Sequence, residues 1–523
     1  MQQSVATTSS PHAVRRLDAG VAVALFLLTL ATRLPLMPPI IAHSDGAGYA
    51  FGMEHFDPLL QRPHPPGYPL FILCARGLLP LLGDANRALL MMNILPAAIA
   101  VAALYLLGLR MFSRTAGLAA AVLLLTCPNF WRTNLMWMSY TAGMCFSVLT
   151  AMALWSGRER RGGGMAVLSA FLLGAGGGFR QQILAFIGPL WAMCLARRPW
   201  WHLLVGLFII AACTAGWMHW AAVSAGGADR YRAAAAAQWR EAIYPTSFGY
   251  AFGHGGWPAV AATARERLGT WASLLFGGGS HASSLPWAIL VLYAIVRKMM
   301  GGTRPGRRAW FLLLWLTPMT LFNIVYHINS QCHVLEYYPP LFLIAGYGLV
   351  RLRDDFAARL RGIRGAWLAG AGIAAAGAFG AAVFVEGTLP AYRSDVATVE
   401  YVLHTIPREF RPGETLIVQS DLRMYFYVVQ FYLRDYASCM LEPTLDPPRP
   451  SLELATGIHS PMLLGPRIRH VVFLNPDARV EGESRKLTMP GGQSAMAIRD
   501  LAPEERWMIF DERGVRFRDR PRS

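Results

Sequence analysis

The sequence has few charged residues. Asp, Glu, Lys and Arg make up only 15% of its 523 residues, whereas 54% are hydrophobic, and the mean hydropathy is +0.34. A soluble globular domain carries about 25% charged residues, so this composition excludes that class and predicts a membrane protein. The formal net charge of +17 would suggest nucleic acid in a soluble protein. Here the basic residues lie mainly on short loops between apolar segments, a pattern that encodes topology, so no nucleic-acid partner is expected.

Cysteine pairs with a functional spacing are also missing. The seven cysteines are scattered, several lie inside apolar runs, and neither CxxC nor a Cys/His metal pattern occurs. We interpret them as small apolar packing residues, and no metal site follows from their spacing.

The N-terminus lacks a small-x-small cleavage site. Arg15 and Arg16 precede an apolar run that ends in ATRLPLMPPII, so we predict a retained first membrane helix rather than a cleaved signal. No internal repeat of a fixed period is present.

Apolar segments long enough for membrane helices recur along the first three quarters of the chain. A span needs about 20 apolar residues, and fewer where the protein is locally thin. The sequence predicts about eleven: Ala19–Leu36, Ala88–Leu109, Ala116–Phe130, Met136–Trp155, Met165–Gly178, Gln182–Leu195, Trp201–Val223, Leu285–Val296, Trp310–Tyr326, Tyr337–Val350 and Ala366–Val385.

The positions of arginine predict the topology. Arginine-rich loops near residues 15, 110, 158, 197, 304 and 351 all fall on one side when the spans alternate, and that side is the cytoplasm. The predicted order is a cytoplasmic tail (1–18), a transmembrane bundle (19–387) with outer loops 37–87 and 224–284, and an extracytoplasmic region (388–523), in the plasma (inner) membrane. Because such loops flank Met165–Leu195 at both ends, GAGGGFRQQ is predicted to be an outer turn between two short helices.

Two outer regions have distinct compositions. The segment 224–284 begins with RYRAAAAAQWREAIY, which predicts a helix, and continues into FGYAFGHGGWP, which we interpret as an interfacial loop because of its glycines and aromatics. Region 388–523 is charged and Pro-rich and predicts a small α/β domain. A helix is expected near Leu422–Leu433, and strands are expected at Thr415–Gln419, His470–Leu474, Trp507–Phe510 and Val515–Arg518.

The stretch from His43 to Tyr68 gathers unusual polarity between two apolar runs. It holds two Asp, one Glu, three His and one Arg within 26 residues. Asp45 follows the first span closely, and a carboxylate there can take a proton from an attacking hydroxyl. Gly46 and Gly48 would let the backbone approach a ligand. The alternative is that Asp45 caps the following helix.

Two further segments carry candidate binding residues. In RPHPPGYP the prolines restrict the backbone and present His64 and Tyr68, although the same residues could simply begin the helix at Pro69. The loop YHINSQCHVLEYY offers side chains for a lipid carrier, a sugar or a divalent cation, or polar groups at the interface. No spacing enforces a metal site, although His43, Asp45, His55 and His333 would form one if brought together.

These motifs resemble a known class. A first span, an outer loop with an early Asp, and HPPGYPLF leading into a helix resemble the GT-C membrane glycosyltransferases, in particular the bacterial relatives of protein O-mannosyltransferases. The later span YYPPLFLIAGYGL is also similar to the class. In that group the early Asp is commonly followed three residues later by Glu, where this chain has Gly48, so a second acid would come from Glu54 or Asp57.

The resemblance implies transfer of a sugar from a polyprenyl-phosphate carrier to an acceptor hydroxyl on a glycan, lipid or protein. Asp45 would be the base, with Arg180 and then Arg62 as candidates for binding the leaving phosphate. Either arginine could instead be a snorkelling or topological arginine. Alternatives are a transporter or flippase of lipid-linked sugars, and a non-catalytic lipid-binding relative. The full set of expected substrate-binding residues is His43, Tyr49, Arg62, His64, Tyr68, Arg180, Gln181, His327, His333, Glu336 and Tyr337.

Overall fold

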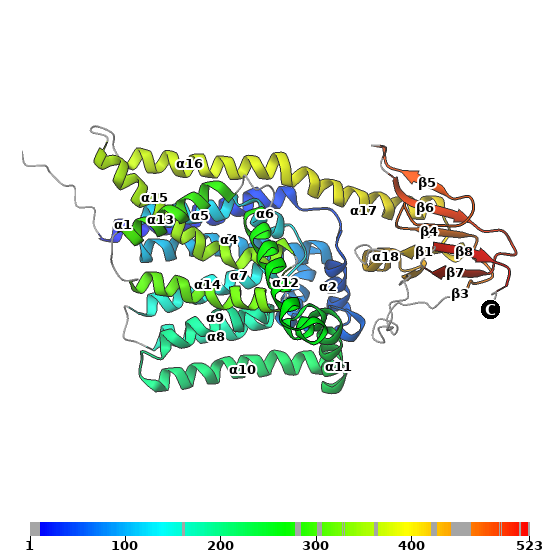
Figure 1. Ribbon diagram of the computed structural model, residues 1–523, viewed down its shortest axis with the longest axis horizontal. Helices are drawn as coiled ribbons and strands as arrows, with labels where there is room; N and C mark the ends of the chain where they lie inside the picture. Colours follow the sequence, from blue (N-terminus) through cyan, green and yellow to red (C-terminus); the bar gives the residue numbers. More distant parts are fainter. Residues whose placement is uncertain are drawn as a thin grey trace, which may run out of the picture.

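The structure is a computed structural model, and its helices run side by side along the long axis with the strands beyond one end (Figure 1). It describes residues 11–158, 163–277, 284–300, 306–326, 328, 330–359, 365–419, 426–440, 462–490, 492, 494–511 and 514–520. The predicted class, a helical membrane protein with a small C-terminal strand-containing region, is confirmed.

Each predicted span corresponds to a helix. These helices are α1 (Pro11–Arg33), α4 (Ala85–Met111), α5 (Arg114–Thr126), α7 (Tyr140–Gly157), α8 (Gly164–Phe179), α9 (Gln182–Leu195), α10 (Trp200–Ser224), α13 (Leu285–Met300), α14 (Arg307–Val325), α15 (Tyr338–Arg359) and α16 (Gly365–Val383). Among the described residues, five helices are long and apolar enough to cross a membrane by length and composition, and four shorter apolar helices accompany them. The number eleven therefore stays a prediction.

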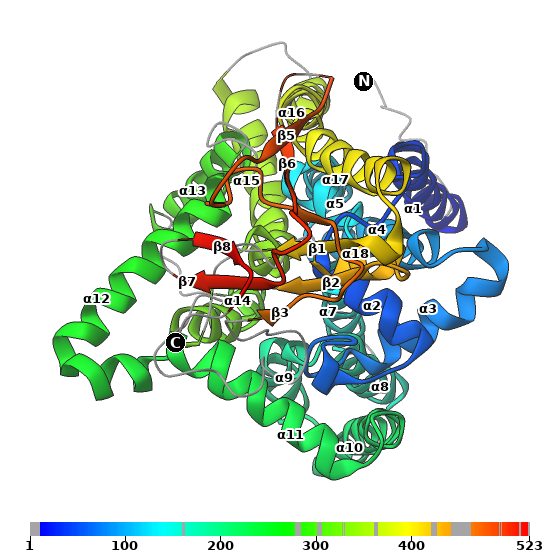
Figure 2. The ribbon, with the colours of Figure 1, turned by 90° about the vertical axis from the view of Figure 1, so that its right-hand side faces the viewer.

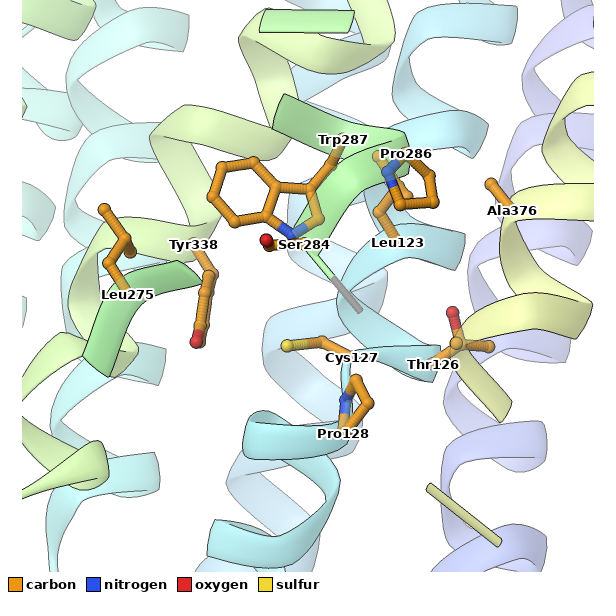
Figure 3. Close-up of a pocket in the computed structure, with 11 residues that line it drawn as sticks. Leu123, Thr126, Cys127, Pro128, Leu275, Ser284, Pro286, Trp287, Tyr338 and Ala376 are labelled. Carbon is orange, nitrogen blue, oxygen red and sulfur yellow. The ribbon is translucent and has the colours of Figure 1, made fainter. Parts of the chain in front are cut away.

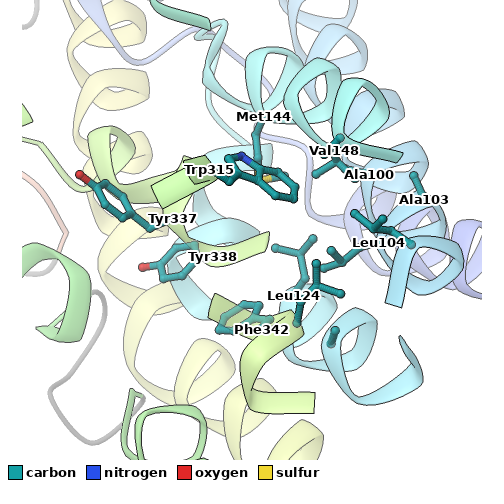
Figure 4. Packing of buried hydrophobic residues seen from close by; sticks show 14 of the residues in the cluster. Ala100, Ala103, Leu104, Leu124, Met144, Val148, Trp315, Tyr337, Tyr338 and Phe342 are labelled. Carbon is teal, nitrogen blue, oxygen red and sulfur yellow. The ribbon is translucent and has the colours of Figure 1, made fainter. Parts of the chain in front are cut away.

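The bundle core is built from leucine, alanine and aromatic side chains of α4, α5, α7, α14 and α15. Leu104, Leu124 and Phe342 are completely buried, and Figure 4 shows them converging with Met144 and Trp315. Small residues let helices approach closely, as is common in membranes. A Cβ added to Gly108 would lie 2.6 Å from the Cα of Gly117, so α4 and α5 touch through their backbones.

Short elements fill the end of the bundle nearest the strands. They are η1 (Leu34–Leu36), α2 (Ser44–Glu54), η2 (Pro58–Leu60), α3 (Pro69–Leu82), α6 (Pro128–Asn134) and η6 (Gln331–Tyr337). The prediction of two short helices is confirmed, but the turn between them is shorter than GAGGGFRQQ: Gly174–Phe179 belong to α8, and the break falls at Arg180, which lies in extended backbone, and Gln181.

The prediction of a loop at FGYAFGHGGWP is wrong. After α11 (Ala228–Gln238), η3 (Trp239–Ile243) and η4 (Tyr244–Thr246), the chain forms α12 (Phe248–Gly277). Within α12 only Gly256 has non-helical dihedrals (φ 61°, ψ −155°), which kink the helix. Glycine supplies that one positive φ without strain, and the remaining aromatics and glycines continue the helix on either side.

The bundle is joined to the C-terminal region by a long helical segment. Helix α16 continues through η7 (Phe384–Thr388) into α17 (Leu389–Glu409), and the combined helix extends from the bundle to the strands (Figure 1). The last predicted span ended at Val385, because the residues that follow it are charged. The structure instead continues it for about six turns, with an apolar face that includes Val396, Val399 and Ile406.

The C-terminal region contains two sheets. After η8 (Pro412–Glu414), one sheet has the order β2-β1-β4-β6-β5, with β1 parallel to β2 and β4, and the other has the order β3-β7-β8 and is antiparallel. The strands are β1 (Thr415–Gln419), β2 (Ala437–Met440), β3 (Met462–Leu463), β4 (His470–Phe473), β5 (Arg485–Thr488), β6 (Ser494–Asp500), β7 (Trp507–Asp511) and β8 (Gly514–Arg518). The four predicted strands are confirmed, and β2, β3, β5 and β6 were not predicted.

Helix α18 (Phe426–Tyr432) packs against α2, as Figure 2 shows. The rings of Phe51 and Phe431 meet edge to face at 5.2 Å between centroids, and the Ile41 N–H donates to the Tyr432 hydroxyl (2.9 Å). Of the predicted helix 422–433, residues 422–425 lie outside the described residues. The C-terminal region thus contacts the element that carries Asp45.

Candidate functional site

A polar cluster occupies the end of the bundle that faces the strands. It is formed by the first turn of α2, the start of α3, the start of α7, the turn between α8 and α9, and η6. We call this group the Asp45 cluster and define it as His43, Asp45, Tyr49, His64, Tyr68, Tyr140, Ser147, Arg180, Gln181, His333 and Glu336.

Asp45 is the most accessible acid of the cluster. Its side chain is 39% exposed, and its Oδ1 lies 3.6 Å from Nδ1 of His64. The hypothesis that Asp45 caps α2 is wrong, since His43 is the N-cap and its Nδ1 accepts the Asp45 N–H (3.1 Å). Burial lowers the pKa of His43, with Arg132 and His64 acting in the same direction, which keeps the ring neutral and able to accept. The Asp45 carboxylate is therefore left for other chemistry.

His64 and two tyrosines hold the Asp45 region in place. Nε2 of His64 lies 2.9 Å from the Tyr68 hydroxyl, while its ring stacks on Tyr49 (5.9 Å between centroids, 19° between planes). Both tyrosines are almost completely buried. Burial raises the pKa of Tyr68, and that of Tyr49 well above its usual value, so both hydroxyls stay protonated at neutral pH. Asp45, His64 and Tyr68 thus form a connected polar row.

Gly46 and Gly48 make room for the protein rather than for a ligand, which corrects the sequence-based interpretation. An added Cβ on Gly46 would lie 2.7 Å from Cβ of Trp137, and one on Gly48 would lie 2.8 Å from the Gln61 carbonyl oxygen. A Glu at position 48 would therefore collide with the backbone of the η2 turn. The absence of a second acid at this position follows from this packing.

Arg180 is the buried cation of the cluster. Its residue is 5% exposed, and the guanidinium lies 3.5 Å from the centroid of the Tyr140 ring. Its Nη1, and both polar side-chain atoms of the neighbouring Gln181, are buried without a hydrogen-bond partner among the described residues. This burial excludes a snorkelling arginine. Buried donors that lack partners are costly in a folded protein, so a ligand is the natural partner for these atoms.

Tyr49, Tyr68 and Tyr140 each interact electrostatically with both Asp45 and Arg180, so the three tyrosines lie near both charges. The cluster therefore combines an accessible carboxylate, a buried guanidinium and three tyrosines.

Glu336 is a second buried acid of the cluster. It is 4% exposed, its Oε2 accepts a hydrogen bond from Ser147 (2.7 Å), and its Oε1 has no partner among the described residues. Burial raises the pKa of Glu336 to about 7, while Ser147 and the charge of Arg180 partly oppose that shift. Near neutral pH this group can donate or accept a hydrogen bond. His333 of the same turn lies near the Tyr140 ring, at 5.6 Å between centroids.

The other predicted acids are engaged elsewhere. Glu54 pairs with Arg434 of the C-terminal region (2.6 Å). Asp57, whose side chain is 4% exposed, accepts the Leu59 N–H and pairs with Arg230 of α11. Both carboxylates thus connect elements around the cluster and lie outside it.

Two predicted binding residues are not brought into the cluster. The guanidinium of Arg62 lies over the Phe51 ring (4.5 Å), and the Tyr337 hydroxyl accepts a hydrogen bond from Asn323 (3.1 Å) inside the bundle. His327 lies outside the described residues.

Tyr140 and Ser147 were missed by the sequence analysis. Both lie on α7, inside a segment interpreted only as an apolar span, and they contact Arg180 in the turn between α8 and α9 and Glu336 of η6. The available signal was the run SYTAGMCFS, in which polar residues recur near the outer end of a span.

Metal binding finds no support in the described part of the chain. No three His, Cys, Asp or Glu side chains there are arranged to hold an ion. His43, Asp45, His55 and His333 do not form such a group, and a divalent cation stays a sequence-based hypothesis.

A small pocket elsewhere in the bundle is lined mainly by apolar groups. Figure 3 shows Trp287 and Tyr338 facing Cys127 and Thr126 across it. None of its lining residues belongs to the Asp45 cluster.

Part of the chain matches a known family. Residues 63–220 match the family described as dolichyl-phosphate-mannose-protein mannosyltransferase. This match, together with the fold, confirms the resemblance to GT-C membrane glycosyltransferases related to protein O-mannosyltransferases. No curated protein sequence matches the chain.

Among solved structures the chain is similar to ArnT from Cupriavidus metallidurans. The structure of ArnT bound to undecaprenyl phosphate superposes with a TM-score of 0.56 at 13% identity, covering 94% of this chain and 98% of ArnT. The apo structure of ArnT gives a TM-score of 0.54 at the same identity and coverage. At this identity the likeness establishes the fold.

Proposed function

We propose that the protein is an integral-membrane glycosyltransferase that moves a sugar from a polyprenyl-phosphate carrier to an acceptor hydroxyl on the outer face of the membrane. The observation that carries this proposal is that one cluster contains both an accessible carboxylate, Asp45, and a buried guanidinium, Arg180. The Nη1 of Arg180 has no hydrogen-bond partner among the described residues. The family match over residues 63–220 and the fold shared with ArnT, which was solved with undecaprenyl phosphate, support it.

Asp45 acts as the general base. The acceptor hydroxyl gives its proton to the Asp45 carboxylate, and the acceptor oxygen forms a bond to the anomeric carbon of the sugar. The bond between that carbon and the phosphate oxygen breaks, and its electron pair leaves with the lipid phosphate. His64 serves as a positioning residue, since it lies 3.6 Å from the carboxylate and is itself held by Tyr68.

Arg180 stabilises the leaving phosphate. Negative charge develops on that phosphate as the bond breaks, and a guanidinium fixed in a dry site stabilises it without reorganising. The unpartnered amide of Gln181 supplies a second donor next to it. Arg62 takes no part, because its guanidinium lies over Phe51.

The buried polar side of the cluster binds the sugar. Oε1 of Glu336 is unpartnered in the described structure, and the Tyr140 ring lies against Arg180 beside it. A sugar hydroxyl that reached Glu336 would satisfy this buried oxygen, and buried polar groups discriminate strongly against ligands that leave them unpaired.

The test compares Asp45→Asn with Asp84→Asn. Asp84 belongs to the same outer loop, its side chain is 47% exposed, and it caps α4 by accepting the Arg87 N–H, which Asn does equally well. We expect Asp45→Asn to reduce transfer from radiolabelled polyprenyl-phosphate sugars about 10²- to 10⁴-fold with carrier binding retained, whereas Asp84→Asn leaves both unchanged.

Two outcomes would contradict the proposal. Unchanged transfer by Asp45→Asn would remove Asp45 from the role of base. If the wild-type protein moved the lipid-linked sugar across a vesicle membrane without transferring the sugar to an acceptor, the result would favour a flippase.

A further inference from the structure

A cavity lies near the helix ends where α7 and α9 end and α10 and α14 begin. Figure 1 shows these helix ends opposite the end of the bundle that faces the strands. The volume of the cavity is about 560 Å³. We call it the basic cavity, and it is lined by Arg158, Leu190, Met193, Cys194, Arg197, Arg198, Pro199, His202, Arg307, Trp310, Phe311 and Leu314.

The charge of the basic cavity has one sign. Four of its lining residues are arginines, and no carboxylate is among the described residues that line it. Arg158, Arg197 and Arg198 all act electrostatically on the thiol of Cys194, so the three arginines lie near it, and Arg198 also donates to the Gly157 carbonyl. Arg307 adds a fourth from the first turn of α14. Guanidinium groups gathered in this way match the geometry and charge of a phosphate.

His202 provides an independent sign of a ligand. It is 6% exposed, its ring stacks on Trp201, and both of its ring nitrogens are buried without a hydrogen-bond partner in the described part of the chain. A neutral imidazole offers one donor and one acceptor. A phosphate oxygen can accept from the donor, and a neighbouring hydroxyl can donate to the acceptor. A phosphoglycerol group carries both.

The remaining wall of the cavity is apolar. Leu190 and Phe311 are buried, whereas Met193 and Trp310 are 48% and 56% exposed at its rim. Both exposed side chains belong to predicted membrane spans, so they face lipid rather than water. An occupant with an anionic head and a hydrocarbon tail fits this division, and a free phosphate would leave the apolar wall uncovered.

We propose that the basic cavity binds the phosphoglycerol headgroup of an anionic phospholipid from the leaflet opposite the Asp45 cluster. The arginines hold the phosphate, His202 contacts the phosphate and a glycerol hydroxyl, and an acyl chain lies along Leu314 and Trp310. Basic pockets between membrane helices commonly bind anionic headgroups in this manner.

The test uses the full-length protein in detergent and in nanodiscs, with phosphatidylglycerol, phosphatidylcholine, glycerol phosphate and inorganic phosphate as separate probes. The readouts are the Tm and lipid binding by native mass spectrometry, neither of which depends on sugar transfer. We expect phosphatidylglycerol to bind and raise the Tm of the wild type, and the other three to do neither.

Two double variants test whether phosphatidylglycerol binding depends on the arginines of the basic cavity. Arg197→Gln/Arg307→Gln removes two arginines of the cavity, and we expect phosphatidylglycerol to bind about 30-fold more weakly, which corresponds to about 1 kcal/mol for each arginine. The control is Arg110→Gln/Arg308→Gln, which removes two arginines from the same end outside the cavity and should leave binding unchanged. Should the double variant fail to fold, His202→Phe keeps an aromatic ring and removes both nitrogens, and it should also weaken binding.

Equal loss of binding in both double variants would overturn the proposal, as would equal stabilisation by phosphatidylcholine. Full competition by inorganic phosphate or glycerol phosphate would identify a soluble anion as the ligand and overturn the lipid assignment. These experiments test lipid binding in the basic cavity alone, so their results neither support nor contradict the proposed transfer reaction.

Discussion

At the residue scale, Arg180 carries a specific expectation. Arg180→Lys keeps the charge and removes the guanidinium fork, so we expect transfer to fall about 10²- to 10³-fold, because a compact ammonium cannot reach the same oxygens. Steady-state transfer in detergent micelles measures this. Arg267→Lys is the matched control, since Arg267 is 7% exposed but donates to the Ile324 carbonyl (2.8 Å) away from the cluster. Equal losses in the two variants would indicate a general packing effect.

Glu336 makes stability depend on pH. Its pKa is about 7 in the folded protein against 4.5 for an unperturbed carboxyl, so between these pH values the folded state holds a proton that the unfolded state has released. The free energy of unfolding therefore decreases as pH rises from about 5 to 7, by about 3 kcal/mol at most.

Glu336→Gln should remove this dependence. We expect its Tm at pH 8 to exceed that of the wild type, with the difference vanishing near pH 5. The exposed Glu386→Gln should follow the wild type at both pH values. A Tm difference that is the same at pH 5 and pH 8 would rule out titration of Glu336 as the cause.

At the element scale, Glu54 and Asp57 connect α2 and η2 to their neighbours, and their variants should separate structure from chemistry. Asp57→Asn removes the charge partner of Arg230, and we expect a loss of about 1–3 kcal/mol in the free energy of unfolding, because Asp57 is buried while Arg230 is half-exposed. Glu54→Gln breaks an exposed pair with Arg434 and should change stability by less than about 1 kcal/mol.

Transfer per folded molecule should stay within about threefold of the wild type in both variants, because a loss from general-base removal would be about 10²-fold or more. Urea titration and transfer assays on the same preparations check the two quantities. A loss of transfer of that size in either variant, with stability unchanged, would indicate that the carboxylate takes part in the transfer reaction.

Elements whose fold is set by local sequence were predictable. The apolar runs and four strands with buried residues each carry their own pattern, and the structure confirms them. The break between α8 and α9 was also expected, although it is shorter than predicted. α12 was not predictable, because its glycines and aromatics disfavour a helix locally and its neighbours α14 and η6 decide the outcome. β5 and β6 form a pair whose outer strand is exposed and polar, so it lacks the alternation that marks a half-buried strand.

The candidate site divides in the same way. The sequence gathered Asp45, His64 and Tyr68 into one stretch and singled out Arg180, because charge and proline stand out against apolar spans. It could not place Tyr140 or Ser147, which reach the cluster across long sequence separations. The interpretation of Gly48 as a point of ligand approach was wrong, because the Gln61 carbonyl lies against this glycine.

At the scale of the whole molecule, the described part of the C-terminal region is joined to the bundle at two places. The first is the helix formed by α16, η7 and α17, and the second is the contact of α18 with α2. Inserting one alanine after Ser394 in α17 would rotate everything beyond it by about 100° and shift it by 1.5 Å. We expect this to separate α18 from α2.

Hydrogen exchange of residues 38–54 measures the separation, because the Ile41 N–H donates to Tyr432 only when α18 is docked. Exchange there should increase, while exchange in α4 stays unchanged. One alanine inserted in the exposed turn after Asp477 should change neither. Unchanged protection after the α17 insertion would mean that the rest of the chain absorbs the rotation.

The length of that helix has a geometric consequence. Trp367–Glu409 comprises 43 residues, which corresponds to about 65 Å, roughly twice the hydrocarbon thickness of a bilayer. The part of this helix that exceeds the bilayer thickness carries the strands past the end of the bundle (Figure 1), where α18 contacts α2. The length of the helix therefore sets how far the strands stand from the core of the bundle.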